Sequence, residues 1–268
     1  MSAVDEVFNR LRDSGDKAFM PFITAGDPDL EFTKSCLKQL DASGCHLIEL
    51  GIPYSDPIAD GPTIQASYTR ALDAGTKLDA IFSMVTDVTQ EIETPIVSMI
   101  SYAIIFRLGP ETFLDKAKAA GFAGAIVPDM PLDESEKFAE LCAAQDFSLI
   151  QLITPTTPQE RAQSIASRST GFIYYVSITG ITGERTELPS DLVDNLKALR
   201  ELTDTPICVG FGISKPEHAE LLKPVADGLI VGSAIVRRME SVKDEASKAT
   251  VLSEIAEFAG SMIEAVKG

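Results

Sequence analysis

Short apolar runs alternate with amphipathic segments along the whole chain. The apolar runs are nearly continuous and rich in Ile, Val and Phe, which is typical of strands buried on both faces of a parallel sheet. The segments between them carry apolar residues at helical spacing; in residues 31–44, Phe32, Cys36, Leu37 and Leu40 share one helix face. The pattern predicts eight strands, at residues 18–24, 45–51, 95–101, 124–129, 147–153, 171–177, 206–212 and 227–233.

Eight buried strands that alternate with helices predict an α/β fold, a single closed (β/α)8 or TIM barrel. An open doubly wound sheet is the structural alternative. An amphipathic segment at residues 2–14 precedes the first strand, and we expect it to form an extra helix across the bottom of the barrel. Extra helices are also expected after the second strand, within residues 52–94, and after the eighth. No linker divides the chain, so residues 1–268 are expected to form one domain.

Charge and composition narrow the classes of partner. The chain has 23 basic and 40 acidic residues, a formal charge of −17, so nucleic acid and anionic membranes are not expected to bind it. The first residues are acidic and amphipathic, unlike a signal peptide, and no apolar stretch approaches the eighteen or so residues that span a bilayer. A cytoplasmic location is the resulting expectation.

The cysteines and histidines do not predict a metal site. The four cysteines are scattered without a CxxC pair and fall within or beside apolar segments, so buried free thiols are expected. His46 is expected to point away from the barrel interior, and His218 lies in a predicted helix. Neither histidine stands near another ligand type, so no metal is expected. The cysteines are Cys36, Cys45, Cys142 and Cys208.

A single carboxylate stands near the end of the second apolar run. Glu49 lies in CHLIELG (45–51), and period-two alternation puts it on the same face as Leu47. Active sites of (β/α)8 barrels lie where the strands end, and desolvation there raises the pKa of a carboxyl toward acid/base use. The alternative is a carboxylate that is paired with a structural partner or faces solvent.

A stiff loop follows this strand. Residues 51–65 (GIPYSDPIADGPTIQ) contain three prolines and two glycines together with Asp56 and Asp60. Asp60 precedes Gly61-Pro62 at the start of a predicted helix, so it is a candidate helix N-cap as much as a candidate catalytic group.

Glycine-rich turns after the seventh and eighth strands indicate a phosphate site. GFGIS (210–214) and VGSAIV (231–236) each precede a predicted helix. Glycine lets the backbone approach an anion, and helix amides and the Ser233 hydroxyl can donate to it. Turns at these two places form the recurrent phosphate site of (β/α)8 barrels. The alternative is tight strand-to-helix packing that needs glycine. The Gly- and Thr-rich segment 178–190 is expected to be a mobile flap over the same phosphate.

Taken together, six segments resemble the tryptophan synthase α family, in the family's order and spacing. The resemblance covers essentially the whole chain, and LGIPYSDPIADGP is its most specific string. Departures are mild: Ile178-Thr179 stand where some relatives have Arg-Ala, and Tyr54 replaces a common Phe. The segments are PFITAGDP (21–28), IELGIPYSDPIADGPTIQ (48–65), VPDMP (127–131), YYVSITGITGE (174–184), GFGIS (210–214) and VGSAIV (231–236).

This resemblance implies retro-aldol cleavage of indole-3-glycerol phosphate to indole and glyceraldehyde 3-phosphate. Glu49 matches the family's general acid/base, and Asp60 matches the carboxylate that binds the indole N–H and stabilises positive charge. The remaining matches are substrate contacts. They comprise the indole-pocket residues Phe22, Ile100, Tyr102 and Tyr174, the flap residue Thr182, and the phosphate-binding residues Gly183, Gly212, Gly232 and Ser233.

The resemblance also implies a partner. The family pairs with a β subunit that holds pyridoxal phosphate, in an αββα assembly that passes indole between active sites, and the α chain needs no cofactor of its own. Pro53 and Asp56 are expected near that contact. Three alternatives stay open: a free-standing lyase that releases indole, a catalytically silent activator of the β subunit, and another phosphate-sugar barrel such as an isomerase of the same pathway.

Overall fold

Eight parallel strands close into a barrel in the computed structural model, which describes residues 1–268 except 59, 178–187 and 211. Each strand pairs with the next along the chain, and β8 pairs with β1. The predicted closed barrel is confirmed, and the open-sheet alternative is wrong. The strands are β1 (Ala18–Thr24), β2 (Ile48–Gly51), β3 (Ile96–Met99), β4 (Phe122–Ile126), β5 (Ser148–Ile153), β6 (Ile173–Val176), β7 (Ile207–Gly210) and β8 (Gly228–Val231).

Every observed strand overlaps a predicted apolar run, but some boundaries differ. β2 begins at Ile48 and not at Cys45, because the Cys45 amide still donates to the Leu40 carbonyl at the end of the preceding helix. β4 begins at Phe122, before the predicted start, because Phe122 already pairs with Ile96 of β3. Burial alone predicted the runs, whereas hydrogen bonding sets where each strand begins.

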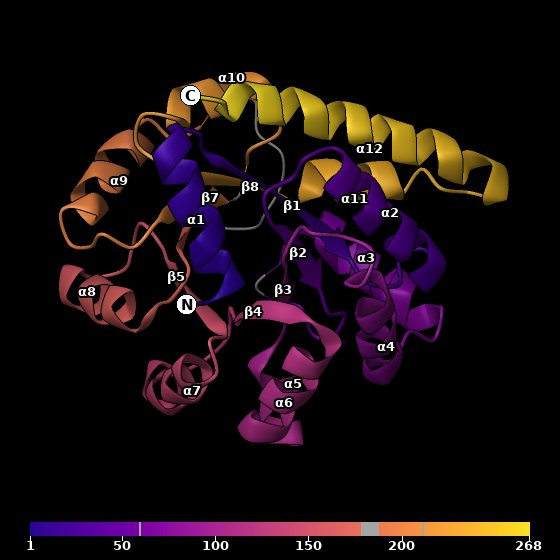
Figure 1. Ribbon diagram of the computed structural model, residues 1–268, viewed down its shortest axis with the longest axis horizontal. Coiled ribbons are helices and arrows are strands. Elements are labelled where there is room, and N and C mark those ends of the chain that lie inside the picture. The colour runs from indigo at the N-terminus through magenta and orange to yellow at the C-terminus, as the bar shows by residue number, and fades with distance from the viewer. Residues whose placement is uncertain (59, 178–187, 211) are drawn as a thin grey trace.

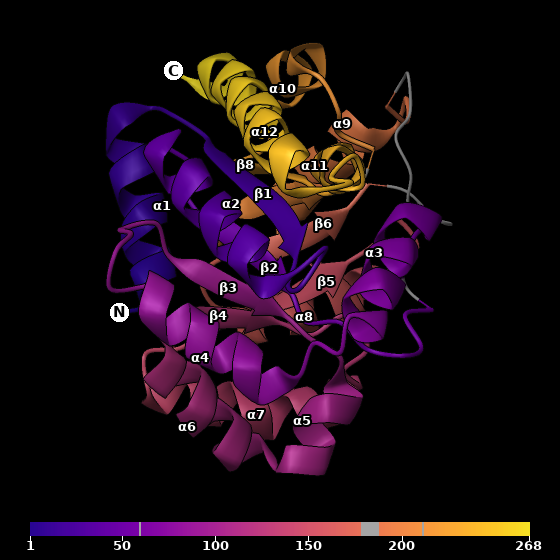
Figure 2. The ribbon, with the colours of Figure 1, turned by 90° about the vertical axis from the view of Figure 1, so that its right-hand side faces the viewer.

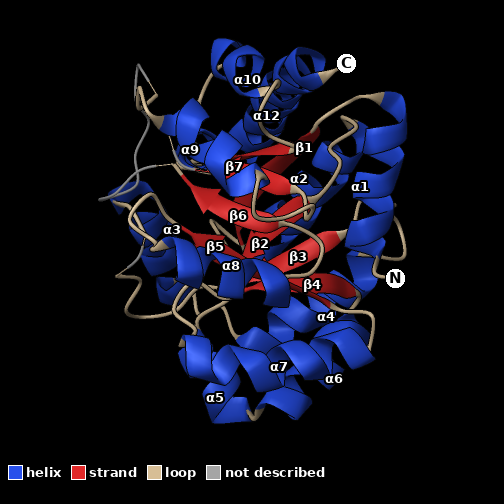
Figure 3. Cartoon of the chain, turned by 90° about the vertical axis from the view of Figure 1, so that its left-hand side faces the viewer, coloured by secondary structure: helices blue, strands red, loops and turns tan. Residues whose placement is uncertain are grey.

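The helices surround the strands as an outer layer (Figure 3). Two helices follow β2 and two follow β8, as predicted. A further pair, α5 and α6, follows β3, where only one helix was expected. The helices are α1 (Ala3–Ser14), α2 (Leu30–Ala42), α3 (Pro62–Asp73), α4 (Leu78–Val88), α5 (Tyr102–Leu108), α6 (Pro110–Ala120), α7 (Leu132–Ala144), α8 (Gln159–Arg168), α9 (Leu192–Arg200), α10 (Pro216–Leu222), α11 (Ser233–Met239) and α12 (Glu245–Val266).

Helix α1 closes the end of the barrel at which the strands begin. Its Phe8 ring packs against Phe172, with ring centroids 5.7 Å apart, and the Ser2 hydroxyl lies 2.7 Å from that of Ser148 at the start of β5. Burying a large apolar side chain stabilises a fold by about 1.5–3 kcal/mol. The predicted extra helix is confirmed. Its buried residues are Val4, Val7, Phe8 and Leu11.

Helix α3 lies on the opposite side of the barrel from α1 (Figure 2). One buried contact and one partly buried contact hold it against the end of β1. The Thr24 and Ser67 hydroxyls lie 2.6 Å apart, and the Arg70 guanidinium donates two hydrogen bonds, of 2.9 and 2.7 Å, to the Asp27 carboxylate. Such a bidentate pair fixes both the distance and the relative orientation of the two side chains. The loop that enters α3 is therefore anchored on one side.

The long helix α12 lies across α10, α11 and α2 (Figure 1). It begins at a capping box, in which the Asp244 side chain accepts from the Ser247 amide and the Ser247 hydroxyl bonds back to the Asp244 backbone amide. This reciprocal cap satisfies amides that would otherwise lack partners at the helix start. In this way the end of the chain covers the outer side of the barrel beside β1.

The surroundings of the cysteines and histidines indicate structural roles. All four cysteines are buried free thiols, as predicted. His46 Nδ1 accepts a hydrogen bond of 3.0 Å from the Phe19 amide, and the buried His218 accepts one of 3.4 Å from the Ser214 amide. Each imidazole therefore ties one segment of backbone to another.

Candidate active site

Strand register places Glu49 at one level of the barrel with aromatic and aliphatic neighbours. Glu49 of β2 pairs with Phe22 of β1 on one side and with Val97 of β3 on the other. Side chains of paired residues in a parallel sheet point to the same face. Glu49, Phe22 and Val97 therefore share one face of the barrel wall.

The Glu49 carboxyl is completely buried. Its exposure is 0%, and neither of its oxygens has a hydrogen-bond partner among the described residues. Both versions of the structural alternative, a carboxylate facing solvent and one paired with a partner, are therefore wrong within the described residues. Desolvation raises the pKa of Glu49 well above its ordinary value, because burial penalises the charged form. Burial therefore favours the neutral form of the Glu49 carboxyl over the charged form.

Asp60 lies in the loop between β2 and α3, and its side chain does not cap that helix. The N-cap of α3 is Gly61, with no side-chain cap bond, so the N-cap interpretation of Asp60 is wrong. The loop is held from within: Gln65 donates hydrogen bonds of 3.1 and 2.8 Å to the carbonyls of Pro57 and Asp60. Burial, and next the charge of Asp129, raise the pKa of Asp60 to about 6.

The two carboxyl groups occupy one neighbourhood. The buried hydroxyls of Tyr68 and Tyr174 each have their pKa raised chiefly by desolvation, with added contributions from both Glu49 and Asp60. Both acids therefore lie near the same two tyrosines. The arrangement places two carboxyl groups with raised pKa values around these rings, and such groups are candidates for acid and base roles in one reaction.

Two glycines make room for the aromatic side chains around this pair. A β-carbon on Gly51 would come 2.4 Å from Phe22 Cζ, and one on Gly210 would come 2.2 Å from the Tyr174 hydroxyl oxygen. Both separations are far below van der Waals contact, so neither position accepts a side chain without movement of the ring. The backbones of β2 and β7 therefore determine where the rings of Phe22 and Tyr174 lie.

Asp129 is part of this neighbourhood, although sequence reasoning assigned it no role. It accepts a hydrogen bond of 2.6 Å from the Ser101 hydroxyl and one of 2.7 Å from the Tyr102 amide, at the start of α5. Its charge contributes to the raised pKa of both Asp60 and Tyr54. The available signal was its place in VPDMP, a polar residue just after a buried strand.

The predicted phosphate residues lie where β7 and β8 end. Gly212 has a positive φ of 78°, a conformation that favours glycine. Gly232 is the N-cap of α11 without a side-chain cap bond, and Ser233 is the first residue of that helix. A β-carbon on Gly232 would be 3.6 Å from Phe22, so the turn after β8 lies beside the ring next to Glu49. Thr182, Gly183 and most of the predicted flap lie outside the described residues.

The other predicted contacts are spread over two places. Ile100 is buried just after β3, whereas Tyr102 is half-buried at the start of α5, with its ring centroid 6.1 Å from that of Phe106. Pro53 is buried and Asp56 is exposed in the loop after β2.

In the described part of the chain, no three His, Cys, Asp or Glu residues gather as a metal-binding group, and no helix is both long and apolar enough to cross a membrane.

Comparison with known proteins gives one consistent result. The sequence model of the family described as tryptophan synthase alpha chain matches residues 8–267. The tryptophan synthase alpha chain of Rhodopirellula baltica is 48% identical over 275 residues, 99% of each chain. That of a Synechocystis strain is 52% identical over 240 residues, 89% of this chain and 91% of the relative. The structure of Mycobacterium tuberculosis tryptophan synthase superposes with a TM-score of 0.90 at 28% identity, covering 100% of this chain and 99% of the other.

A closed parallel barrel, with a buried glutamic acid on strand β2 and a second carboxyl in the loop after that strand, is typical of the class of (β/α)8-barrel enzymes. The comparisons go one step further. The chain belongs to the tryptophan synthase alpha chain family and is a lyase of tryptophan biosynthesis.

Proposed function

We propose that Glu49 and Asp60 divide between them the retro-aldol cleavage of indole-3-glycerol phosphate to indole and glyceraldehyde 3-phosphate. The observation that carries this proposal is a pair of carboxyl groups that act on the same two buried tyrosines. Glu49 is buried without a described partner, and burial favours its neutral form, whereas the pKa of Asp60 is about 6. A neutral carboxyl can give a proton, and a carboxyl with a pKa of about 6 is mostly ionised at pH 7 and can hold a negative charge.

Glu49 acts first as an acid and then as a base. Its proton goes to the indole ring carbon that bears the glycerol chain, which makes that carbon able to leave. The resulting Glu49 carboxylate takes the proton from the hydroxyl on the adjacent chain carbon. The carbon–carbon bond then breaks, its electron pair returns to the ring, and the hydroxyl becomes the aldehyde of glyceraldehyde 3-phosphate. Glu49 ends the cycle protonated, as it began.

Asp60 stabilises the positive charge that the first step creates. Protonation of the ring carbon leaves a cation delocalised onto the indole nitrogen. A carboxylate that accepts the indole N–H stabilises this cation more than it stabilises the neutral substrate, which lowers the barrier. The stiff loop, held by Gln65 and by the α3 anchor, fixes the carboxylate before the substrate arrives.

The substrate is proposed to lie with its indole between aromatic side chains and its phosphate at the turns after β7 and β8. Phe22 supports this placement, because it pairs with Glu49 and also lies against the Gly232 turn. In this proposal Ile100, Tyr102 and Tyr174 bound the indole, and Thr182, Gly183, Gly212 and Ser233 complete the substrate contacts. The chain itself carries no cofactor.

The partner is proposed to be the β subunit of tryptophan synthase, which supplies pyridoxal phosphate and receives indole in an αββα assembly. An exposed apolar surface supports this. A cavity of about 600 Å³ opens between the loop after β2 and α5; Ile58 and Leu72 line it, and both are exposed, at 82% and 37%. Phe106 of α5 is 73% exposed. Apolar surface of this kind is typical of a protein interface, and the exposed Asp56 lies at its rim.

A cytoplasmic location belongs to the same proposal. The four cysteines, spread over the chain, are all free thiols. Disulfides are typical of oxidising compartments, and reduced thiols of the cytoplasm.

One assay separates the proposal from its alternatives. The purified chain is given indole-3-glycerol phosphate, alone and with β subunit, and the release of indole or tryptophan is followed. A slow reaction alone that becomes much faster with β subunit is the expected result. Equal rates with and without β subunit would indicate a free-standing lyase. Absence of cleavage, together with faster β-subunit turnover of added indole, would indicate a silent activator, and absence of both would point to a different phosphate-sugar reaction.

A further inference from the structure

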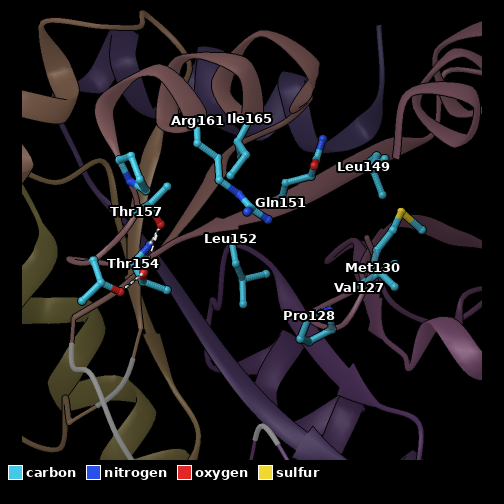
Figure 4. Close-up of a pocket in the computed structure, with 12 residues that line it drawn as sticks. Val127, Pro128, Met130, Leu149, Gln151, Leu152, Thr154, Thr157, Arg161 and Ile165 are labelled. Atoms are coloured by element: carbon cyan, nitrogen blue, oxygen red, sulfur yellow. Dashed lines mark hydrogen bonds between the residues drawn. The ribbon is translucent and has the colours of Figure 1, made fainter. Parts of the chain in front are cut away.

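A further cavity has a volume of about 370 Å³ and opens between β5 and α8, near the end of β4 (Figure 4). Cavities that hold small organic ligands have about 300–1,000 Å³. Along β5, Leu149 and Gln151 face the helices, whereas Leu152 pairs with Tyr174 and lies on the interior face. Gln151 and Arg161 therefore line the cavity on the helix side of the wall, while Leu152, Pro128 and Met130 line it next to the catalytic neighbourhood.

Two hydrogen-bond donors at this cavity have no acceptor among the described residues. The Gln151 amide nitrogen is buried and makes no hydrogen bond. Arg161 of α8 is exposed and makes no ion pair or hydrogen bond with the described residues, and Figure 4 shows its side chain reaching from the helix toward β5, where Gln151 lies. A buried amide without a partner costs about 1–3 kcal/mol. A ligand with oxygen acceptors would satisfy both donors, and an anionic acceptor would suit the guanidinium best.

The remaining lining favours a negative charge with an apolar body. None of the described residues around the cavity is acidic, in a chain with a formal charge of −17. Helix α8 begins here at Pro158 without a side-chain cap bond, so its positive end adds to Arg161. The hydroxyl of Thr154 bonds to those of Thr156 and Thr157 at the rim. Val127, Leu149 and Ile165 supply apolar surface.

We propose that this cavity binds a small organic monocarboxylate, with its carboxylate between Arg161 and the Gln151 amide and its apolar body against Leu149 and Ile165. Inorganic phosphate would satisfy the donors but would leave the apolar surface uncovered. A neutral amide of the same shape would cover that surface but would leave the guanidinium without a counter-charge. The site is therefore expected to bind an organic carboxylate more tightly than inorganic phosphate or a neutral amide.

Benzoate, benzamide and inorganic phosphate test the proposal on the full chain. Binding is followed by methyl-labelled NMR, in which benzoate should shift Ile165 and Leu149 and leave Ile100 in place. We expect benzoate to bind at least tenfold more tightly than benzamide or phosphate. Equal binding of benzoate and benzamide, or shifts confined to Ile100, would overturn the proposal.

Matched variants assign the donors. Arg161→Met keeps the aliphatic stem and removes the charge, and should weaken benzoate at least tenfold. Arg168→Met removes the same charge from the other end of α8, outside the cavity, and should bind as the parent does. Gln151→Leu should weaken benzoate without lowering thermal stability, because its amide nitrogen has no hydrogen bond to lose. If Arg161→Met and Arg168→Met bind benzoate alike, the cavity is not the site.

Discussion

Tyr174 of β6 lies over Gly210 of β7 so closely that a β-carbon on Gly210 would come 2.2 Å from the tyrosine hydroxyl oxygen. The Tyr174 ring is buried, and the carboxyl groups of Glu49 and Asp60 both contribute to the raised pKa of its hydroxyl. The backbone of a neighbouring strand therefore determines where one wall of the candidate active site lies.

This contact predicts the effect of adding one methyl group. Gly210→Ala should displace the Tyr174 ring toward the two carboxyl groups and reduce kcat/KM by at least tenfold. The double variant Gly210→Ala, Tyr174→Phe removes the hydroxyl that clashes and should recover part of that loss relative to Tyr174→Phe alone. Steady-state kinetics on the three variants measures the coupling. Strictly additive effects would show that the contact does not position Tyr174.

The burial of Glu49 predicts that its charge-neutral isostere loses activity without losing stability. Glu49→Gln cannot transfer a proton, so kcat should fall by about 10²–10⁴-fold. No described partner hydrogen bonds to the Glu49 oxygens, so the free energy of unfolding should not decrease. Cleavage assays and urea unfolding of the same preparation test both halves. Turnover within a few-fold of the parent would contradict the acid/base role.

Asp60 predicts a stability difference that depends on pH. The pKa of Asp60 is raised from 3.8 to about 6 in the folded state, so between these values the folded state binds more protons than the unfolded state. The contribution of Asp60 to stability therefore falls as pH rises through this window. Asp60→Asn removes the titration, and its stability relative to the parent should increase from pH 4 to pH 6 by up to about 3 kcal/mol and then stay constant.

Urea unfolding at pH 4, 5, 6 and 7 measures this difference. The same variant should lose most lyase activity, because an amide offers no negative charge to the cationic intermediate. Binding of an indole analogue that carries the phosphate, but has no positive charge on its ring, should weaken much less than turnover. A variant that is less stable than the parent at pH 7 would instead indicate that the Asp60 side chain supports the start of α3.

Ser233 tests the phosphate site. Ser233→Asp puts a carboxylate at the first residue of α11, where a helix start tolerates it. Two like charges 4 Å apart repel by about 4 kcal/mol at an effective dielectric of 20, so affinity for the phosphorylated substrate should fall steeply while the fold stays stable. Ser233→Ala loses only one hydrogen bond and should weaken binding several-fold. Substrate binding equal to that of the parent in Ser233→Asp would place the phosphate elsewhere.

The sequence predicted the barrel because short apolar runs, which form buried strands, recur along the chain. This recurrence can be recognised from the residue types alone. The sequence prediction missed α5, whose sequence YAIIFRL is apolar except for Arg107 although only Ile105 is fully buried. Exposed apolar residues such as Phe106 mimic a core pattern, and only the packed structure separates the two.

The site was predicted in the same uneven way. Glu49 is evident from its place in an apolar strand, but the raised pKa of Asp60 comes first from burial and next from the charge of Asp129, which belongs to another crossover. No pattern along the chain could have indicated that these carboxyls act on each other. The cavity beside Arg161 was missed for a similar reason, because the unpaired Gln151 amide becomes visible only when all its neighbours are in place.

The pairing of Ala18 with Gly228, which closes the barrel, bears on how the protein is made. During synthesis β1 leaves the ribosome before β8. Until β8 emerges, one side of β1 has unpaired backbone groups, and such open strand edges recruit other chains. A ribosome that stops between β1 and β8 releases a sheet with two open edges. The barrel therefore closes its edges only after β8 has been translated, and products truncated before β8 are expected to aggregate.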